Sequence, residues 1–534
     1  MNKYIKILTT TLFIVISLFA INKLTLAAGL AKDTLYLPLT SEPGTIDPNH
    51  ASGTWEREII DNIFTGLMEL DAKGKTKKAL AESWAISKDG KVYTFKLKQT
   101  LWNDGTPLTA NDFVFSYERM LNPLSSAKYA EILYPIAGAE EYNTGKINDF
   151  SKVGVKAIDN YTLQITLKEA ESFFTERLLH YTYYPIPEHI VKKHGKAWTK
   201  VGNIVSNGAY NIIEWTPNKI IKLIRNEKFY ENALTKINNI HFLSMGSDVD
   251  IQYKAFQANQ IDISSFDAKI VDKVKANFKD QVYIFPIQAQ SYLSINALKP
   301  SNKALLNPDV RKAMMYAYDS SFIIPKVKGL SIPATSIIPP SMGSYNPVKG
   351  FWVGMETKQR IEEAKKLMEK NGYNQKNRVK IKYYHMNNKT ASEVVTLVKN
   401  LFEQIYIDLE LVPLDTNIFY DEITAHNHDV AAMGWSADYN DASTFFYIMM
   451  SGVGNNYSGY SNKELDKLVK EGMKELDEKK RNALYAKAEQ IAQKDLFYLP
   501  YVFFTDRLII SKRVMNWAPN AQGHFLVRWL DLSR

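Results

Sequence analysis

Two hydrophobic periodicities alternate along this chain and restrict the folds that it can adopt. Residues 91–98 alternate apolar and polar side chains with a period of two, as a half-buried strand does, and residues 161–167 repeat the pattern. Thr109 and Asp112 have the spacing of a capping box, and the apolar residues after them recur at helical spacing. Strand and helix patterns then follow one another to about residue 504. The sequence therefore predicts a mixed α/β fold.

The chain of 534 residues is too long for a single hydrophobic core. At roughly 100 to 200 residues per domain, this length predicts about two to four domains. Hydrophobic residues make up 45% and charged residues 23%, which is the composition of an ordinary globular protein. A strand–helix–strand rhythm over residues 379–414 indicates that the C-terminal half contains a sheet of its own.

The first 28 residues have the order of a secretory signal peptide. Lys3 and Lys6 precede an apolar run at residues 7–21, and the small residues Ala27 and Ala28 follow. The alternative is a transmembrane anchor, but about fifteen apolar residues fall short of the roughly twenty that span a bilayer. We therefore expect cleavage near Ala27 or Ala28 and export of the mature protein.

The chain contains no cysteine, which excludes disulfides, thiolate metal ligands and a lipid-modified cysteine. A free periplasmic protein fits this composition better than a tethered lipoprotein. The formal net charge of +9 is spread along the sequence and forms no basic stripe. Because no nucleic-acid readout motif accompanies the charge, no nucleic-acid partner is expected.

No common catalytic or nucleotide-binding motif occurs in the sequence. The chain lacks Gly-x-Ser-x-Gly, His-Glu-x-x-His, the P-loop and Gly-x-Gly-x-x-Gly, so an enzyme is disfavoured and no cofactor is expected. His426, His428 and Asp429 form a candidate metal cluster, because two histidines at i and i+2 face the same way on a strand. No further ligand accompanies them, and a polar loop is the favoured interpretation.

Aromatic residues surround one carboxylate near the C-terminal end. Asp438 follows Trp435 by three residues and precedes Tyr439, and a carboxylate among aromatic faces suits an ammonium group. The 31 tyrosines and nine tryptophans exceed what cores usually demand, and some of them suit the lining of a cleft. The alternative is a strand leading into a turn, with Asp438 and Asp441 as ordinary loop residues.

Four segments occur in a recognisable order along the chain. They are Ala79-Leu-Ala-Glu-Ser-Trp84 with Trp102-Asn-Asp-Gly-Thr-Pro107, then Gly202-Asn-Ile-Val-Ser-Asn-Gly-Ala-Tyr210, Asp309-Val-Arg-Lys-Ala313 and Gly434-Trp-Ser-Ala-Asp-Tyr439. In these segments the chain resembles the extracytoplasmic peptide-binding proteins of ATP-driven importers, and the oligopeptide-binding proteins most closely. The resemblance extends over nearly the whole mature chain.

The resemblance implies a three-lobed α/β periplasmic binding protein. Two lobes would close over the ligand by a hinge at two chain crossings, near residues 290 and 505, and the third would be an extra lobe. The implied division is a signal peptide at 1–28, a discontinuous lobe I at 29–64, 189–290 and 506–534, lobe II at 65–188, and lobe III at 291–505.

The resemblance also implies where the ligand binds. An extended peptide would add as a strand to the backbone of residues 434–436, and Asp438 would bind its amino terminus. Thr54 and Tyr129 match positions on the facing side. The expected ligand-binding residues are Thr54, Tyr129, Tyr292, Gly434, Trp435, Ser436 and Asp438.

One position departs from the family pattern. Oligopeptide binders commonly carry an arginine, which helps to hold the carboxyl end of short peptides, where this chain has Ala432. Lys299, Lys389 or another base could replace it for longer peptides. Alternatively, the carboxyl end stays solvated or the ligand is not a plain peptide.

The expected function is that of a monomeric periplasmic receptor without catalytic activity. It would bind short peptides and deliver them to an inner-membrane ABC permease with its ATPase subunits. The alternatives are a receptor of the same fold for a nickel chelate, haem or a cell-wall peptide, a periplasmic peptide-binding chaperone, and, least favoured, a peptidase.

Overall fold

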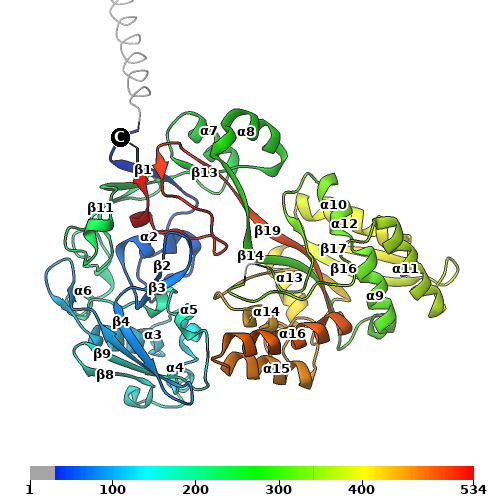
Figure 1. Ribbon diagram of the computed structural model, residues 1–534, viewed down its shortest axis with the longest axis horizontal. Helices are drawn as coiled ribbons and strands as arrows, with labels where there is room; N and C mark the ends of the chain where they lie inside the picture. Colours follow the sequence, from blue (N-terminus) through cyan, green and yellow to red (C-terminus); the bar gives the residue numbers. More distant parts are fainter. Residues whose placement is uncertain (1–29, 341, 534) are drawn as a thin grey trace, which may run out of the picture.

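The computed structural model describes residues 30–340 and 342–533, apart from the side chains of residues 389–390 and 416–417. The expected signal peptide therefore lies outside the described residues. Two bodies are connected by two long strands, β14 (Val282–Ile295) and β19 (Tyr498–Ile510), as Figure 1 shows. The mixture of helices and sheets confirms the predicted α/β class.

One end of the first body, which we call lobe I, is built on a four-stranded sheet. β1 runs parallel to β12, and β11 and β10 follow in antiparallel order. The strands are β1 (Thr34–Leu39), β12 (Asn239–Ser244), β11 (Ile220–Arg225) and β10 (Tyr210–Thr216). The helices and short strands beside them are α2 (Thr54–Ile63), α6 (Glu188–His194), α7 (Val249–Gln257), β13 (Ile263–Ser265), α8 (Val271–Phe278), β20 (Val514–Met515) and β21 (Asp531–Leu532).

The other end of the first body, lobe II, contains an antiparallel sheet in the order β4-β5-β9-β8. Its strands are β4 (Ala81–Ile86), β5 (Val92–Leu97), β9 (Thr162–Thr166) and β8 (Val155–Asp159), and its helices are α3 (Ala110–Leu121), α4 (Ala139–Asn143) and α5 (Phe174–Arg177). The short hairpins β2 (Met68–Leu70) with β3 (Thr76–Lys78) and β6 (Thr100–Leu101) with β7 (Pro107–Leu108) flank the sheet. Thr109 caps α3 through the predicted capping box with Asp112.

Lobes I and II share one hydrophobic core. Buried Leu35 and Leu223 of the lobe I sheet belong to the same cluster as Phe95 and Leu163 of the lobe II sheet. The buried side chains of the second body form separate clusters. Lobes I and II therefore constitute one packed unit, and the second body is another.

The second body, lobe III, is organised around a sheet in the order β13-β19-β14-β18-β16-β17, with β15 paired to β19. Its own strands are β15 (Ile332–Pro333), β16 (Val379–Met386), β17 (Ile407–Leu414) and β18 (Val430–Ser436). Its helices are α9 (Pro308–Ala317), α10 (Ser320–Lys326), α11 (Thr357–Lys370), α12 (Lys389–Glu403), α13 (Thr416–Thr424), α14 (Ser443–Tyr447), α15 (Lys463–Lys474) and α16 (Glu478–Asp495). The parallel pair β16 and β17 is the predicted strand–helix–strand unit.

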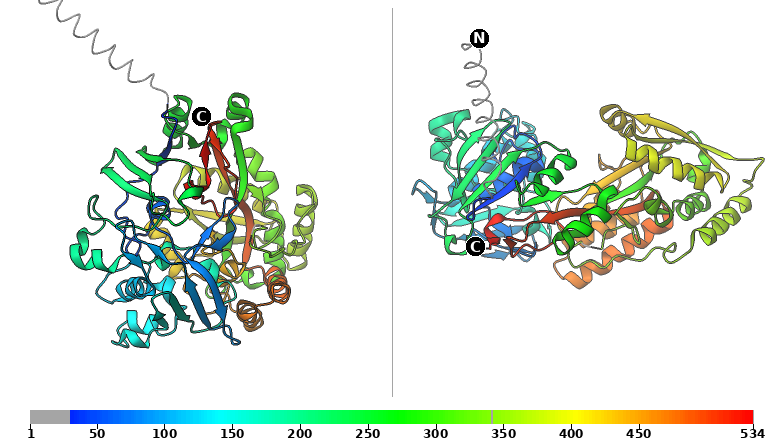
Figure 2. Two further views of the ribbon diagram at one scale, coloured as in Figure 1. Left: turned by 60° about the vertical axis from the view of Figure 1, so that its left-hand side comes forward. Right: turned by 90° about the horizontal axis from the view of Figure 1, so that it is seen from above.

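The pairing of β14 with β19 is irregular where the two bodies meet. The two strands pair from Val282 to Pro286 and again from Gln290 onward, and the register shifts in between. Such an irregularity lets a strand bend locally. Figure 2 shows both strands running between the two bodies.

Within the described residues, none of the helices combines the length and the apolar character that crossing a bilayer requires.

Candidate functional site

One edge of β18 is open at the end that approaches the first body. On one side β18 pairs with β14 along its length, from Val430 opposite Ile295 to Ser436 opposite Ala289. On the other side β16 pairs with it only at Val430 and Ala431. Among the described residues, no strand continues this second edge, and Gly434 and Ser436 are exposed. The free backbone groups of such an edge are a template for an added strand.

Asp438 stands just past this open edge and is positioned by one hydroxyl. Thr444 Oγ1 accepts hydrogen bonds from Asp438 N at 3.3 Å and from Trp435 Nε1 at 3.2 Å. The same hydroxyl donates to Asp438 Oδ2 at 3.3 Å. Its one donor and two acceptor sites are thereby used. The strand end, the tryptophan and the carboxylate are held as a unit by α14.

The carboxylate of Asp438 faces solvent and forms no direct ion pair with the described part of the chain. Its side chain is exposed, and no cationic nitrogen of the described residues lies within 4.0 Å of it. The protein on both sides of the site limits hydration and raises the pKa of Asp438, while the charge of Arg177 and the bond from Thr444 oppose that rise. An ammonium group from a ligand would complete this site.

Tyr129 and Thr54 lie in the first body, and of the two only Tyr129 has a pKa that the charge of Asp438 shifts. Burial raises the pKa of Tyr129, and the negative charges of Glu131 and Asp438 raise it further. The Tyr129 ring also lies 6.1 Å from the ring of His180. Thr54 is exposed at the first turn of α2, in lobe I.

The side chain of Tyr292, one of the expected ligand-binding residues, is buried in the core of lobe III. Its side chain is 1% exposed and packs 5.0 Å from the ring of Tyr498 in a lobe III cluster. Successive side chains of a strand point to opposite faces of the sheet, so Tyr292 enters the core while its neighbour Ser291 lines a cavity on the other face. Sequence reasoning did not single out Ser291, because polar and apolar residues do not alternate strictly along β14.

This cavity, of about 610 Å³, lies between lobe I and lobe III. Residues 267–269 line it from lobe I, and Ser291, Ala432 and Gly434 line it from the sheet of lobe III. Its cationic lining is Lys269, Lys328 and Arg507. Lys269 pairs with Glu393 of α12 at 3.7 Å, across the two bodies.

Two of these cations, Lys328 and Arg507, make no ion pair with any described residue. No carboxylate of the described residues lies within 4.0 Å of Lys328 or Arg507, and Arg507 Nε is buried without a hydrogen-bond acceptor. Of the two expected bases, Lys299 instead bonds to Asn427, just before the far end of β18, at 3.2 Å. The side chain of Lys389 lies outside the described part of the chain.

The candidate metal cluster is divided by its hydrogen bonds. The carboxylate of Asp429 accepts bonds from Ser301 and from Lys382 N, and His426 Nδ1 contacts the carbonyl of Tyr457. His428 is 1% exposed, and its burial lowers its pKa to about 4. Within the described residues, no group of three or more His, Cys, Asp or Glu side chains has an arrangement that could hold a metal ion.

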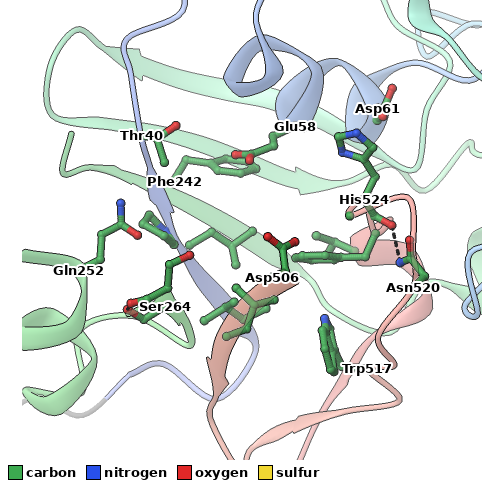
Figure 3. Close-up of a pocket in the computed structure, with 18 of the residues that line it drawn as sticks. Thr40, Glu58, Asp61, Phe242, Gln252, Ser264, Asp506, Trp517, Asn520 and His524 are labelled. Carbon is green, nitrogen blue, oxygen red and sulfur yellow. Dashed lines mark hydrogen bonds between the residues drawn. The ribbon is translucent and has the colours of Figure 1, made fainter. Parts of the chain in front are cut away.

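A second cavity, of about 210 Å³, lies wholly in lobe I (Figure 3). Glu58 and Asp61 of α2, Asp506 of β19, and Trp517 and His524 of the C-terminal segment line it. Burial and the neighbouring charge of Asp61 raise the pKa of Glu58 to about 7. None of the residues expected to bind the ligand lines this cavity.

Comparisons with known proteins place these features in context. Residues 75–457 match the sequence pattern of the bacterial extracellular solute-binding proteins, family 5 Middle. The chain is 34% identical over 487 residues to the periplasmic oligopeptide-binding protein OppA of Escherichia coli (strain K12). This alignment covers 90% of this chain and 89% of that protein.

Two solved structures show the same fold. The unliganded open form of the periplasmic murein tripeptide binding protein MppA has a TM-score of 0.85, with 27% identity over 94% of this chain and 98% of that one. Haemophilus influenzae OppA in complex with the peptide RPPGFSPFR has a TM-score of 0.74, with 28% identity over 94% and 99% of the two chains.

Proposed function

The chain belongs to family 5 of the bacterial extracellular solute-binding proteins, and from this membership we propose that it is a periplasmic receptor for short peptides. It binds the peptide in an extended conformation and delivers it to an ATP-driven importer. The observation that carries the proposal is the open edge of β18, which ends beside the unpaired carboxylate of Asp438.

The open edge of β18 and the carboxylate of Asp438 each match one chemical feature of a peptide. The backbone of residues 434–436 offers hydrogen bonds that do not depend on the peptide's sequence. Asp438 binds the amino terminus, and Tyr129 closes the site from the first body. The side chains of the peptide enter the cavity of about 610 Å³ beside β18, where water can mediate their contacts with the protein.

The carboxyl end of the peptide then lies toward Lys328 and Arg507, which take the place of the arginine missing at Ala432. We expect the double substitution Lys328→Gln with Arg507→Gln to weaken binding of a free-acid peptide by about tenfold, because charge-assisted bonds to the carboxylate are lost. The C-terminally amidated peptide should bind both proteins equally. Titration calorimetry with the two peptides measures the difference.

Lys299→Gln is the matched control for this experiment, since Lys299 is a cation of lobe III outside the cavity. It should leave both affinities unchanged. An equal loss for the acid and the amide in the double variant would contradict the assignment of Lys328 and Arg507.

Binding should weaken in acid because Asp438 must be ionised to hold an ammonium group. A bound ammonium lowers the pKa of this carboxyl, whereas the limited hydration of the site raises it in the free protein. Affinity is therefore constant above the free-protein pKa and falls about tenfold for each pH unit below it. Glu171, Arg177 and Tyr129 are the ionisable neighbours. The check is calorimetry between pH 7 and pH 4, where Asp438→Asn should give a flatter profile than the wild type.

The lobes are proposed to close over the ligand as two units. Lobe I comprises 29–64, 189–290 and 506–534, lobe II comprises 65–188, and lobe III comprises 291–505. The common core of lobes I and II and the irregular pairing of β14 with β19 support a hinge between these lobes and lobe III. Small-angle scattering should give a smaller radius of gyration with peptide than without it.

The protein is further proposed to be exported, with cleavage of residues 1–28, and to act as a monomer without a lipid anchor or a catalytic site. Its partners are then the inner-membrane permease and the ATPase subunits of an importer. Mass spectrometry of ligands that copurify with the protein, or that it captures from a mixed peptide library, tests the proposal. Intact short peptides support it, whereas haem, a metal chelate, long unfolded chains or cleavage products would each replace it by another function.

A further inference from the structure

A cation of lobe II lies beside the carboxylate that is proposed to bind the ligand. The guanidinium carbon of Arg177, at the end of α5, lies 4.4 Å from the ring centroid of Tyr439, the residue after Asp438. Phe173 stacks on the same ring at 4.4 Å with an interplanar angle of 7°. The same guanidinium carbon lies 5.3 Å from the Phe173 ring, so Arg177 packs beside the stacked pair and places a positive charge next to the open site.

Arg177 is held by a pair of hydrogen bonds to Glu171. Arg177 Nε donates to Glu171 Oε2 at 2.6 Å, and Nη2 donates to Oε1 at 3.3 Å. The side chains are only 17% and 10% exposed, so water competes weakly for either partner. The guanidinium makes no direct ion pair with Asp438, although its charge lowers the pKa of that carboxyl.

The side chains of Glu171, Arg177 and Asp438 together carry a net charge of about −1, which one further cation would neutralise. Glu171 and Arg177 cancel each other, and Asp438 keeps a negative charge that matches the ammonium group of a peptide. The charge of Arg177 already lowers the pKa of Asp438, so without the charge of Glu171 the resident guanidinium would compete with the ligand for that carboxylate. An arginine that lacks its buried partner gains strongly from a new one.

We propose that Glu171 is a positioning residue that reserves Asp438 for the amino group of the ligand by holding Arg177 against Tyr439. This inference rests on the proposed function, since it presumes that Asp438 receives an ammonium group. It adds a residue of lobe II that touches no ligand but sets how strongly free amino termini are bound.

The experiment compares Glu171→Gln with the wild type, using one tripeptide with a free amino terminus and the same tripeptide acetylated. Glu171→Gln should weaken binding of the free-amino peptide by about tenfold, because Arg177 then competes for Asp438. Binding of the acetylated peptide, which is weak in the wild type, should not change. A general loss of packing would instead weaken both peptides.

A second substitution guards against misfolding. Glu171→Gln with Arg177→Met removes the competing cation together with its partner and should restore the free-amino affinity to within about threefold of the wild type. Glu169→Gln is the matched control. Glu169 is also a lobe II carboxylate at the contact with lobe III, where it pairs with Lys474 at 2.9 Å, but its charge is not among those that shift the pKa of Asp438. It should leave both affinities unchanged.

Asp438→Asn distinguishes a failure of the Glu171 proposal from a failure of the proposed peptide site. If it abolishes selection for the free amino group while Glu171→Gln has no effect, or if the double variant does not recover, the role of Glu171 is refuted and the receptor function stands. If the wild type binds neither peptide, or if Asp438→Asn binds both as the wild type does, the proposed site itself is wrong.

Discussion

Asp438→Ala should weaken the binding of peptides with a free amino terminus by about two to three orders of magnitude. In the closed complex the carboxylate and the ammonium group form an ion pair away from bulk water. Removing one member of such a pair costs on the order of 3–5 kcal/mol, because the other charge remains buried and unpaired. Titration calorimetry of the purified protein with a tripeptide measures the loss.

Asp438→Asn tests whether charge rather than shape is responsible. The amide can keep the hydrogen bonds with Thr444 but cannot neutralise an ammonium group, so it should lose nearly as much affinity as Ala. Acetylation of the peptide should remove most of the difference between the variants and the wild type. Unchanged affinity of Asp438→Ala for the free-amino peptide would contradict the assignment of Asp438 to the amino terminus of the peptide.

Features set by neighbouring residues could be predicted from the sequence. The capping box of Thr109 and Asp112 starts α3, and Pro308 starts α9 at its first position with Asn307 as the cap. Both depend on residues within one helical turn. The α/β class followed from many such local signals, and the family followed from motifs that span the chain.

Features set by distant residues could not be predicted in this way. Arg177 precedes Asp438 by more than 250 positions, and only the packing of lobe II on lobe III brings its charge to the site. Tyr292 fits a strand pattern on either face of the sheet, and the choice of face depends on its contact with Tyr498, which is distant in sequence. The cations of the cavity, Lys328 and Arg507, come from separate elements for the same reason.

Gly208, within one of the family motifs, should be the least replaceable glycine at the junction of α2 and β10. Its N–H donates to Ile63 O at 2.9 Å, and an added Cβ would lie 2.4 Å from Ile63 C, 2.6 Å from Phe64 N and 2.7 Å from Asn62 O. All three are backbone atoms at the end of α2, so no side-chain rotation can relieve the clash. Neighbouring Asn207 fixes the same backbone through two bonds with Thr65.

We therefore expect Gly208→Ala to destabilise the protein by about 3 kcal/mol or more, at the upper end of what overpacking costs. The midpoint of thermal unfolding should fall by several degrees, and peptide affinity should fall as well, because α2 carries Thr54 on the wall of lobe I. Gly454→Ala is the control, since nothing lies within 4 Å of its added Cβ. Equal unfolding midpoints for the two variants would mean that the junction of α2 with β10 yields more easily than its close backbone packing implies.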